Sequence, residues 1–437
     1  MNRIPHLCSL LILTFAPLSA QTIASPFGSP SPNGSPIDGP PLVVSKFWHP
    51  WLADDNPKCN FIIPTYAVAD DGLWIGGYFN QAEKGRIFKI SLPDFTTTGM
   101  DTANGKEVTS MACFSDALYA SCDRFVNHFM VKDGMARYDL ASHTWTTRQL
   151  GTRFKQNFYL LNGSLYLDAN GSADGPPVRE SAIVKYDWNA DKTTILASSR
   201  RKPGQNQFDD VPAYEIAGIF LGPGNKPCVT TRSGTFYIQE TPGPWPRVFD
   251  GTFGDDVLTG TSNALVLNQY GEITLMDPSS PAPIPLMAPL EPIHRKGAAL
   301  ERAPWAGQAL WDSPGKDTPI WSSIVGYHDG NLYVLAKPKV KGGTFELLCY
   351  QKGAERTPRR IPLKFQLDAS VVASIPPGGD RMPNGWSQNE IEHPDTSLIP
   401  LTLITTNQGL CVKLFCVGFW FLPYGDIETY LKSAHHS

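Results

Sequence analysis

The chain has 437 residues, of which 41% are hydrophobic and 18% charged, and it contains 38 glycines and 39 prolines. This composition is typical of a turn-rich globular protein and excludes a coiled coil or a wholly disordered chain. The formal net charge of -4 gives no basic excess to neutralise phosphates, so we expect no nucleic-acid partner.

The start of the chain predicts a signal peptide over residues 1–20. Arg3 supplies a positive charge, an apolar run follows at residues 7–15, and small residues precede Gln21, as at a signal-peptidase site. This run is too short to cross a bilayer, and no later stretch reaches the roughly eighteen apolar residues that a span needs, so we expect no membrane span. The sequence therefore predicts a secreted or periplasmic protein.

A linker is predicted over residues 21–41, because SPFGSPSPNGSPIDGPP (25–41) is rich in Pro, Ser and Gly and cannot bury apolar surface. We expect residues 42–437 to form a single domain.

Within that domain one unit recurs, a small polar turn followed by an apolar strand. Clear copies are ADDGLWIGG (69–77), SDALYAS (115–121), NGSLYLD (162–168), SNALVLN (262–268), HDGNLYVLA (328–336) and NQGLCVK (407–413), with a weaker one at 224–231. A strand precedes each turn, and a second strand–turn–strand segment follows each copy, from RIFKISLPDFTT (86–97) to GFWFLPYGDIETYL (418–431). Seven such units predict an all-β fold, a seven-bladed β-propeller of four-stranded antiparallel blades.

The first unit carries a diglycine, and several units carry two large apolar or aromatic residues at a fixed spacing. Gly76 and Gly77 end a strand of the first unit, and Tyr138 and Trp145 have six residues between them. Phe88 and Phe95, and Ile238 and Trp245, keep the same spacing. In these features the chain resembles kelch-like propellers of the bacterial exported type, over most of residues 60–433. A propeller must close its ring, and PLVVSKFW (41–48) is predicted to supply the strand missing from the last blade.

The predicted connections differ in length between the two faces of the propeller. With the strands of a blade named A to D from the centre outward, A–B and C–D turns lie on one face, and B–C loops and D–A connections on the other. The long segments are of the second kind, above all the D–A connections at 288–319 and 366–397. Long loops on a rigid scaffold commonly bind ligands, so we expect binding on the face formed by the B–C and D–A loops.

The two longest connections supply the candidate ligand-binding residues. These are Trp305, Trp311, Trp386, His294, Arg295, Arg302, Arg381, Asn389 and Glu390. An indole beside polar and charged side chains suits a sugar or another polar ring, because the indole stacks while the polar groups fix orientation. The alternative is that these tryptophans anchor the long loops onto the blades.

Metal and disulfide motifs are weak. The segment DANGSADG (168–175) has the alternating oxygens of a calcium loop, but Ala173 and Arg179 depart from the EF-hand pattern, and a polar loop is the favoured interpretation. We expect no metal and no cofactor. Cys113 with Cys122, or Cys411 with Cys416, could form a disulfide, although unpaired buried residues are favoured.

Motifs of hydrolases and of nucleotide-binding enzymes are missing from the sequence. The sequence therefore favours a non-catalytic propeller that binds a glycan, peptide or protein partner. The alternative is a carbohydrate-active enzyme, a hydrolase or lyase with acids on the same face, since propellers host both.

Overall fold

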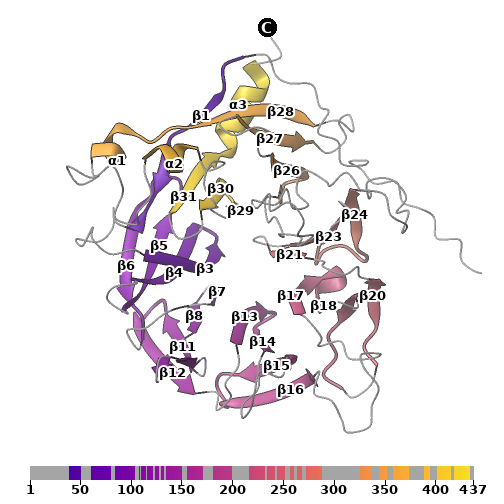
Figure 1. The fold of residues 1–437 in the computed structure, drawn as a ribbon. Helices are drawn as coiled ribbons and strands as arrows, with labels where there is room; N and C mark the ends of the chain where they lie inside the picture. Colours follow the sequence, from indigo (N-terminus) through magenta and orange to yellow (C-terminus); the bar gives the residue numbers. More distant parts are fainter. Residues whose placement is uncertain are drawn as a thin grey trace, which may run out of the picture.

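The computed structural model confirms a seven-bladed β-propeller (Figure 1). Seven sheets, each with four antiparallel strands in series, stand in a ring, and the first strand of each sheet is the innermost. The structure describes residues 39–50, 61–79, 84–103, 108, 110–114, 116–121, 124–126, 129–131, 134–149, 155–170, 181–198, 216–231, 234–241, 244–250, 256–259, 263–267, 272–287, 325–336, 344–351, 358–373, 388–393, 401–414 and 418–433.

The first three blades follow the chain directly. Blade 1 is β3 (Phe61–Ala69), β4 (Gly72–Phe79), β5 (Lys84–Ser91) and β6 (Thr97–Asp101). Blade 2 is β7 (Met111–Cys113), β8 (Ala117–Ser121), β11 (Gly134–Asp139) and β12 (Thr144–Gln149), with a hairpin of β9 (Arg124–Val126) and β10 (Phe129–Val131) between its second and third strands. Blade 3 is β13 (Lys155–Leu161), β14 (Ser164–Asn170), β15 (Ser181–Asp187) and β16 (Lys192–Ser198).

The next three blades repeat the plan. Blade 4 is β17 (Ile216–Gly222), β18 (Lys226–Thr231), β19 (Gly234–Tyr237) and β20 (Arg247–Asp250), with a 3-10 turn at Pro223–Asn225. Blade 5 is β21 (Asp256–Thr259), β22 (Ala264–Leu267), β23 (Ile273–Met276) and β24 (Ile284–Met287). Blade 6 is β25 (Val325–His328), β26 (Asn331–Ala336), β27 (Phe345–Tyr350) and β28 (Arg359–Phe365), followed by α1 (Ala369–Ala373) and α2 (Gln388–Glu392).

Blade 7 closes the ring with strands from both ends of the chain. It contains β29 (Leu401–Thr405), β30 (Gly409–Leu414) and β31 (Gly418–Pro423), and its outer strand is β2 (Lys46–Trp48), antiparallel to β31. The preceding strand β1 (Leu42–Val44) instead adds to blade 6, parallel to β28. The expected closing strand at 41–48 is therefore confirmed, but it is divided between two blades.

The end of the chain corrects one expectation, since the second half of GFWFLPYGDIETYL is not a strand. Residues Tyr424–Ser433 form the helix α3, because Ile427 and Leu431 recur at helical spacing and are buried. Asp426 in its first turn and Lys432 in its last turn also suit the helix dipole. The fourth strand of blade 7 is therefore β2, which pairs with β31.

Adjacent blades are held together by apolar side chains from their facing surfaces. Between blades 1 and 2 these include Trp74 and Ile87 from one side and Leu118 from the other. The blades also approach closely here, since a Cβ on Gly76 would lie 2.7 Å from Met111 Sδ and 2.9 Å from Val108 Cγ1. Close contact with the next blade therefore leaves no room for a side chain at position 76.

Aromatic residues from the outer hairpins pack onto the preceding blade. The Trp145 ring contacts Tyr138 at 5.0 Å between centroids, and its Nε1 donates to Asp101 O of blade 1 at 3.2 Å. Trp188 lies edge-on to Tyr119 of blade 2 at 5.6 Å. Phe95, in a turn with φ of 59°, packs on Phe419 and Phe421 of blade 7. The repeated aromatic spacing thus marks contacts between blades.

No helix in the described part of the chain is long and apolar enough to cross a membrane.

Candidate binding surfaces

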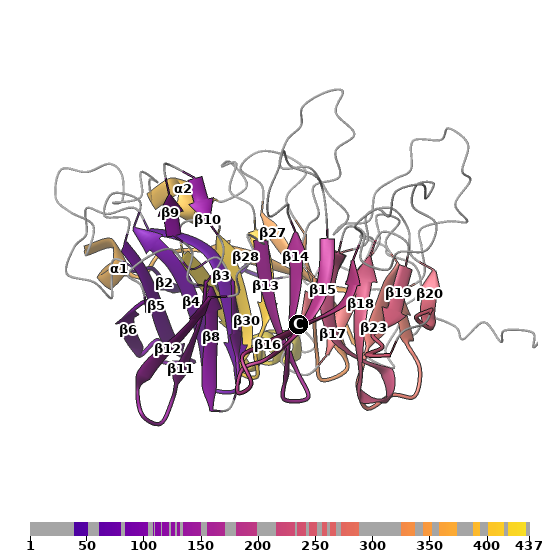
Figure 2. The ribbon, with the colours of Figure 1, turned by 90° about the horizontal axis from the view of Figure 1, so that it is seen from below.

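The predicted binding face carries two described elements beyond the blades. Figure 2 shows α2 and the β9–β10 hairpin at one face of the ring, opposite the tight turns that join β11 to β12 and β13 to β14. The hairpin belongs to the B–C loop of blade 2, and α2 belongs to the D–A connection between blades 6 and 7. Both types of connection therefore add structure to the same face.

Two predicted site residues, Asn389 and Glu390, lie in α2, and the helix is fixed to blade 6. Ile391 is fully buried. Glu392 Oε1 accepts a hydrogen bond from Leu367 N at 2.8 Å, just beyond the end of β28, and another from Gln388 Nε2 at 3.3 Å. Asn389 is exposed. The helix thus uses Ile391 and Glu392 as anchors and leaves Asn389 accessible to solvent.

The other predicted site residues lie outside the described residues, and their common position in one groove stays a prediction. They are Trp305, Trp311, Trp386, His294, Arg295, Arg302 and Arg381.

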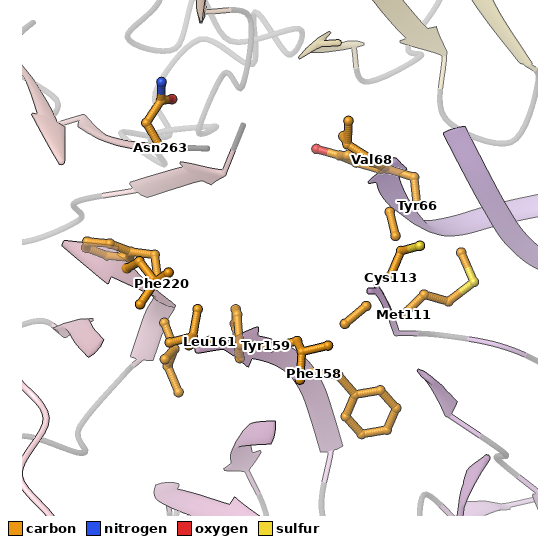
Figure 3. A pocket seen from close by; sticks show the side chains of 14 residues that line it. Tyr66, Val68, Met111, Cys113, Phe158, Tyr159, Leu161, Phe220 and Asn263 are labelled. Atoms are coloured by element: carbon orange, nitrogen blue, oxygen red, sulfur yellow. The ribbon is translucent and has the colours of Figure 1, made fainter. Parts of the chain in front are cut away.

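A cavity lies at the centre of the ring, at the end opposite the face formed by the B–C and D–A loops. It has a volume of about 260 Å³ and is lined by the final residues of β3, β7, β13 and β17, and by Asn263 before β22. Figure 3 shows the lining as an arc that runs from Asn263 and Phe220 through Tyr159 to Cys113 and Tyr66. Because these strands end at the A–B turns, the cavity is near the face of tight turns.

The second strand of blade 3 contains a buried carboxylate. The Asp168 side chain of β14 is 1% exposed. Its Oδ2 accepts hydrogen bonds from Asn157 Nδ2 at 2.8 Å and from Tyr159 OH at 3.2 Å, and its Oδ1 accepts one from Asn157 N at 2.8 Å. Burial and the neighbouring Asp168 carboxylate raise the pKa of Tyr159, so its hydroxyl stays a hydrogen-bond donor. The group joins strands β13 and β14 at the centre of blade 3.

This arrangement bears on the calcium motif. Asp168 and Asn170 lie in β14, paired with β13 and β15, and the Asp168 carboxylate is occupied by Asn157 and Tyr159. The polar stretch therefore begins as a strand, and its first residue, Asp168, makes hydrogen bonds within blade 3. Residues 171–175 lie outside the described residues. No group of three metal-binding side chains occurs among the residues that the structure describes.

Four cysteines are described, and each has a free thiol: Cys113, Cys228, Cys349 and Cys411. Cys113 and Cys411 are thus free in the structure, and their suggested partners Cys122 and Cys416 lie outside the described residues. Burial raises the pKa of the Cys113 thiol to about 11 and that of Cys228 to about 12. These thiols remain protonated and react slowly at neutral pH.

Sequence reasoning missed the cavity, because its lining residues belong to the innermost strands. Tyr66 and Tyr159 occupy positions that the repeat marks only as apolar strand residues. No local pattern in the sequence distinguishes these tyrosines from the apolar residues at equivalent positions of the other blades.

No protein-family model matches the chain, and no curated protein matches it. Solved structures resemble it only distantly. A chain in the structure of YCF48 bound to D1 peptide is 12% identical, with a TM-score of 0.41 and coverage of 88% of this chain and 99% of that one. Puromycin hydrolase is 13% identical, with a TM-score of 0.42, and the match covers 71% of this chain and 47% of that one. The computationally designed Ika8 protein is 10% identical, with a TM-score of 0.39 and coverage of 88% and 100%. These are likenesses of fold alone, and the fold is that of a seven-bladed β-propeller.

Proposed function

We propose that the chain is an exported, non-catalytic, kelch-like propeller that binds a glycan, peptide or protein partner on the face formed by its B–C and D–A loops. The observation that carries this proposal is the anchoring of α2. Its Ile391 is fully buried and its Glu392 accepts a hydrogen bond from Leu367 N, while Asn389 is exposed. A polar side chain on a short helix fixed to a blade loses little conformational freedom when it binds a ligand.

The architecture of the ring supports the same face. Each blade is fixed to its neighbours by buried apolar clusters, so the scaffold is rigid. Connections on the opposite face are short, such as the turn between His328 and Asn331. The long connections before blades 6 and 7 emerge from adjacent blades, so their loops can contribute to one binding surface.

A glycan array combined with a panel of glycoside hydrolase and lyase substrates tests the proposal. We expect retention of one ligand class without turnover. Turnover of a carbohydrate, lost when an acid on this face is replaced, would instead establish a carbohydrate-active enzyme.

Alanine substitution of the three loop tryptophans separates binding from anchoring. If Trp305, Trp311 and Trp386 form a binding platform, each change should weaken ligand binding by about 1–3 kcal/mol and leave the melting temperature nearly unchanged. Calorimetric titration with the array ligand and thermal melts measure both quantities. Trp145→Ala is the control, because Trp145 packs on Tyr138 and its loss should lower the melting temperature. A similar loss in all three loop variants would identify them as anchors.

Export predicts a specific mature terminus. Protein isolated from its native host should begin at or near Gln21, because small residues precede that position. N-terminal sequencing or intact-mass measurement reads this out. Intact Met1 on protein from the cytosolic fraction would contradict export.

A further inference from the structure

The cavity at the A–B end of the channel has walls from the innermost strands of four blades and from Asn263 of a fifth. Its lining comes from the ends of β3, β7, β13 and β17, each part of a four-stranded sheet packed between neighbours. A volume of about 260 Å³ is slightly below the range of drug-sized pockets. It therefore suits a ligand of roughly ten to fifteen non-hydrogen atoms.

The lining side chains are uncharged at neutral pH. They are apolar apart from the tyrosine hydroxyls, the Asn263 amide and the Cys113 thiol. A charged ligand would lose its hydration here without an opposite charge in the wall.

The charges that flank the cavity have opposite signs. Lys413 Nζ lies 5.9 Å from the centre of the Tyr66 ring, where it disfavours a cation. Asp70 and Asp71 form the turn directly after β3, where Asp71 pairs with Lys89 at 2.7 Å. Burial chiefly raises the pKa of Cys113, and both carboxylates add to this effect. They disfavour an anion. Neither sign of ligand charge is favoured.

The backbone of the lining strands can supply directional contacts. Each of β3, β7, β13 and β17 is the terminal strand of its sheet and pairs on one side only. One inner amide, Phe158 N, already donates to Ser110 Oγ at 2.9 Å. Unpaired strand edges offer alternating N–H and C=O groups, which match the donor and acceptor of an amide.

From these observations we propose that the cavity binds an uncharged ligand that combines an amide group with a small apolar side chain. The ligand enters from the face of tight turns and is separate from any partner on the B–C and D–A face. Its apolar part lies against the apolar lining of the cavity, and its amide pairs with the inner strand edges and Asn263.

Four small leucine compounds test the charge preference on the full chain, and the two N-acetyl compounds are matched in size. They are N-acetyl-leucinamide, which is neutral, leucinamide, a cation, N-acetyl-leucine, an anion, and leucine, a zwitterion. Saturation-transfer NMR and calorimetric titration should show the neutral compound binding at least about tenfold more tightly than each of the others. No binding of the neutral compound, or equal binding of a charged one, overturns the proposal.

Filling the cavity tests its location. Val68→Trp adds bulk at the lining and should abolish binding of N-acetyl-leucinamide, while Val43→Trp, on the exposed outer strand β1, should not change it. Thermal melts establish that each variant folds. If Val68→Trp does not fold, Asn263→Trp replaces it, because Asn263 lies directly before β22 and outside the strand. Binding that survives in a folded, filled variant places the ligand elsewhere and overturns the proposal.

Discussion

Replacing Trp48 with alanine should lower the free energy of unfolding by about 3–5 kcal/mol, as expected for a fully buried aromatic side chain. Trp48 is 2% exposed and lies where blade 7 meets blade 1. Its ring stacks on Phe419 at 5.5 Å and meets Phe88 edge-on at 5.6 Å. Its Nε1 donates to Thr97 Oγ1 at 3.0 Å. The substitution therefore removes packing between the first and last blades together with a hydrogen bond.

Urea unfolding followed by circular dichroism measures this effect. Val43→Ala is the matched control, because Val43 lies in the same N-terminal segment but is 50% exposed, and it should leave the transition almost unchanged. Equal transitions for Trp48→Ala and the parent protein would show that ring closure does not depend on this residue.

Replacing Asp168 with alanine should cost roughly 2–5 kcal/mol of stability, because it leaves buried donors without their acceptor. The carboxylate accepts hydrogen bonds from Asn157 N, Asn157 Nδ2 and Tyr159 OH. Each of these donors would remain between β13 and β14 with at most a water molecule to accept from it. The loss should appear in chemical denaturation at neutral pH.

A surface control and a second variant at position 168 accompany this measurement. Asp94→Ala, in an exposed turn of blade 1, is the surface control and should leave the denaturation midpoint unchanged. Asp168→Asn should lie between the parent and Asp168→Ala, because its amide retains one oxygen acceptor of similar shape. If Asp168→Ala had the same denaturation midpoint as the parent protein, water would replace the carboxylate without loss of stability.

The blades could be predicted because their signals are local. A turn such as Asn162-Gly163 adopts positive φ at both residues, with values of 50° and 73°, as a tight hairpin requires. The alternating residues after it then fill the contacts between blades, for example Leu165 and Leu167. Repetition of this pattern determines both the fold and the number of blades.

Pairing between distant segments could not be predicted in the same way. The stretch 41–48 has the composition of one strand, yet Val44 pairs with Phe365 of blade 6 and Trp48 with Phe419 of blade 7. Its partners lie more than 300 residues along the chain, and no local pattern identifies them. The helix α3 did have a local signal in Ile427 and Leu431, but similarity to the other hairpins favoured a strand.

The predicted site residues show a similar limit. Asn389 and Glu390 were selected for their chemistry, whereas the structure shows that Ile391 and Glu392 hold the helix in place. The cavity near Tyr66 and Tyr159 depends on four blades meeting around one axis, a relation that no single repeat contains.

The position of β2 also determines when during synthesis the molecule can be completed. Lys46–Trp48 leaves the ribosome long before its partner Gly418–Pro423. Individual blades are hairpins with local contacts and can form as they emerge, whereas the last pairing needs almost the whole chain. Until then Phe47 and Trp48 lack the aromatic partners that bury them. A chain that stopped before β31 would leave the apolar segment Phe47–Trp48 and strand β30 without their partners, both recognisable by chaperones and proteases. The closing pair therefore forms only after all seven blades have been made.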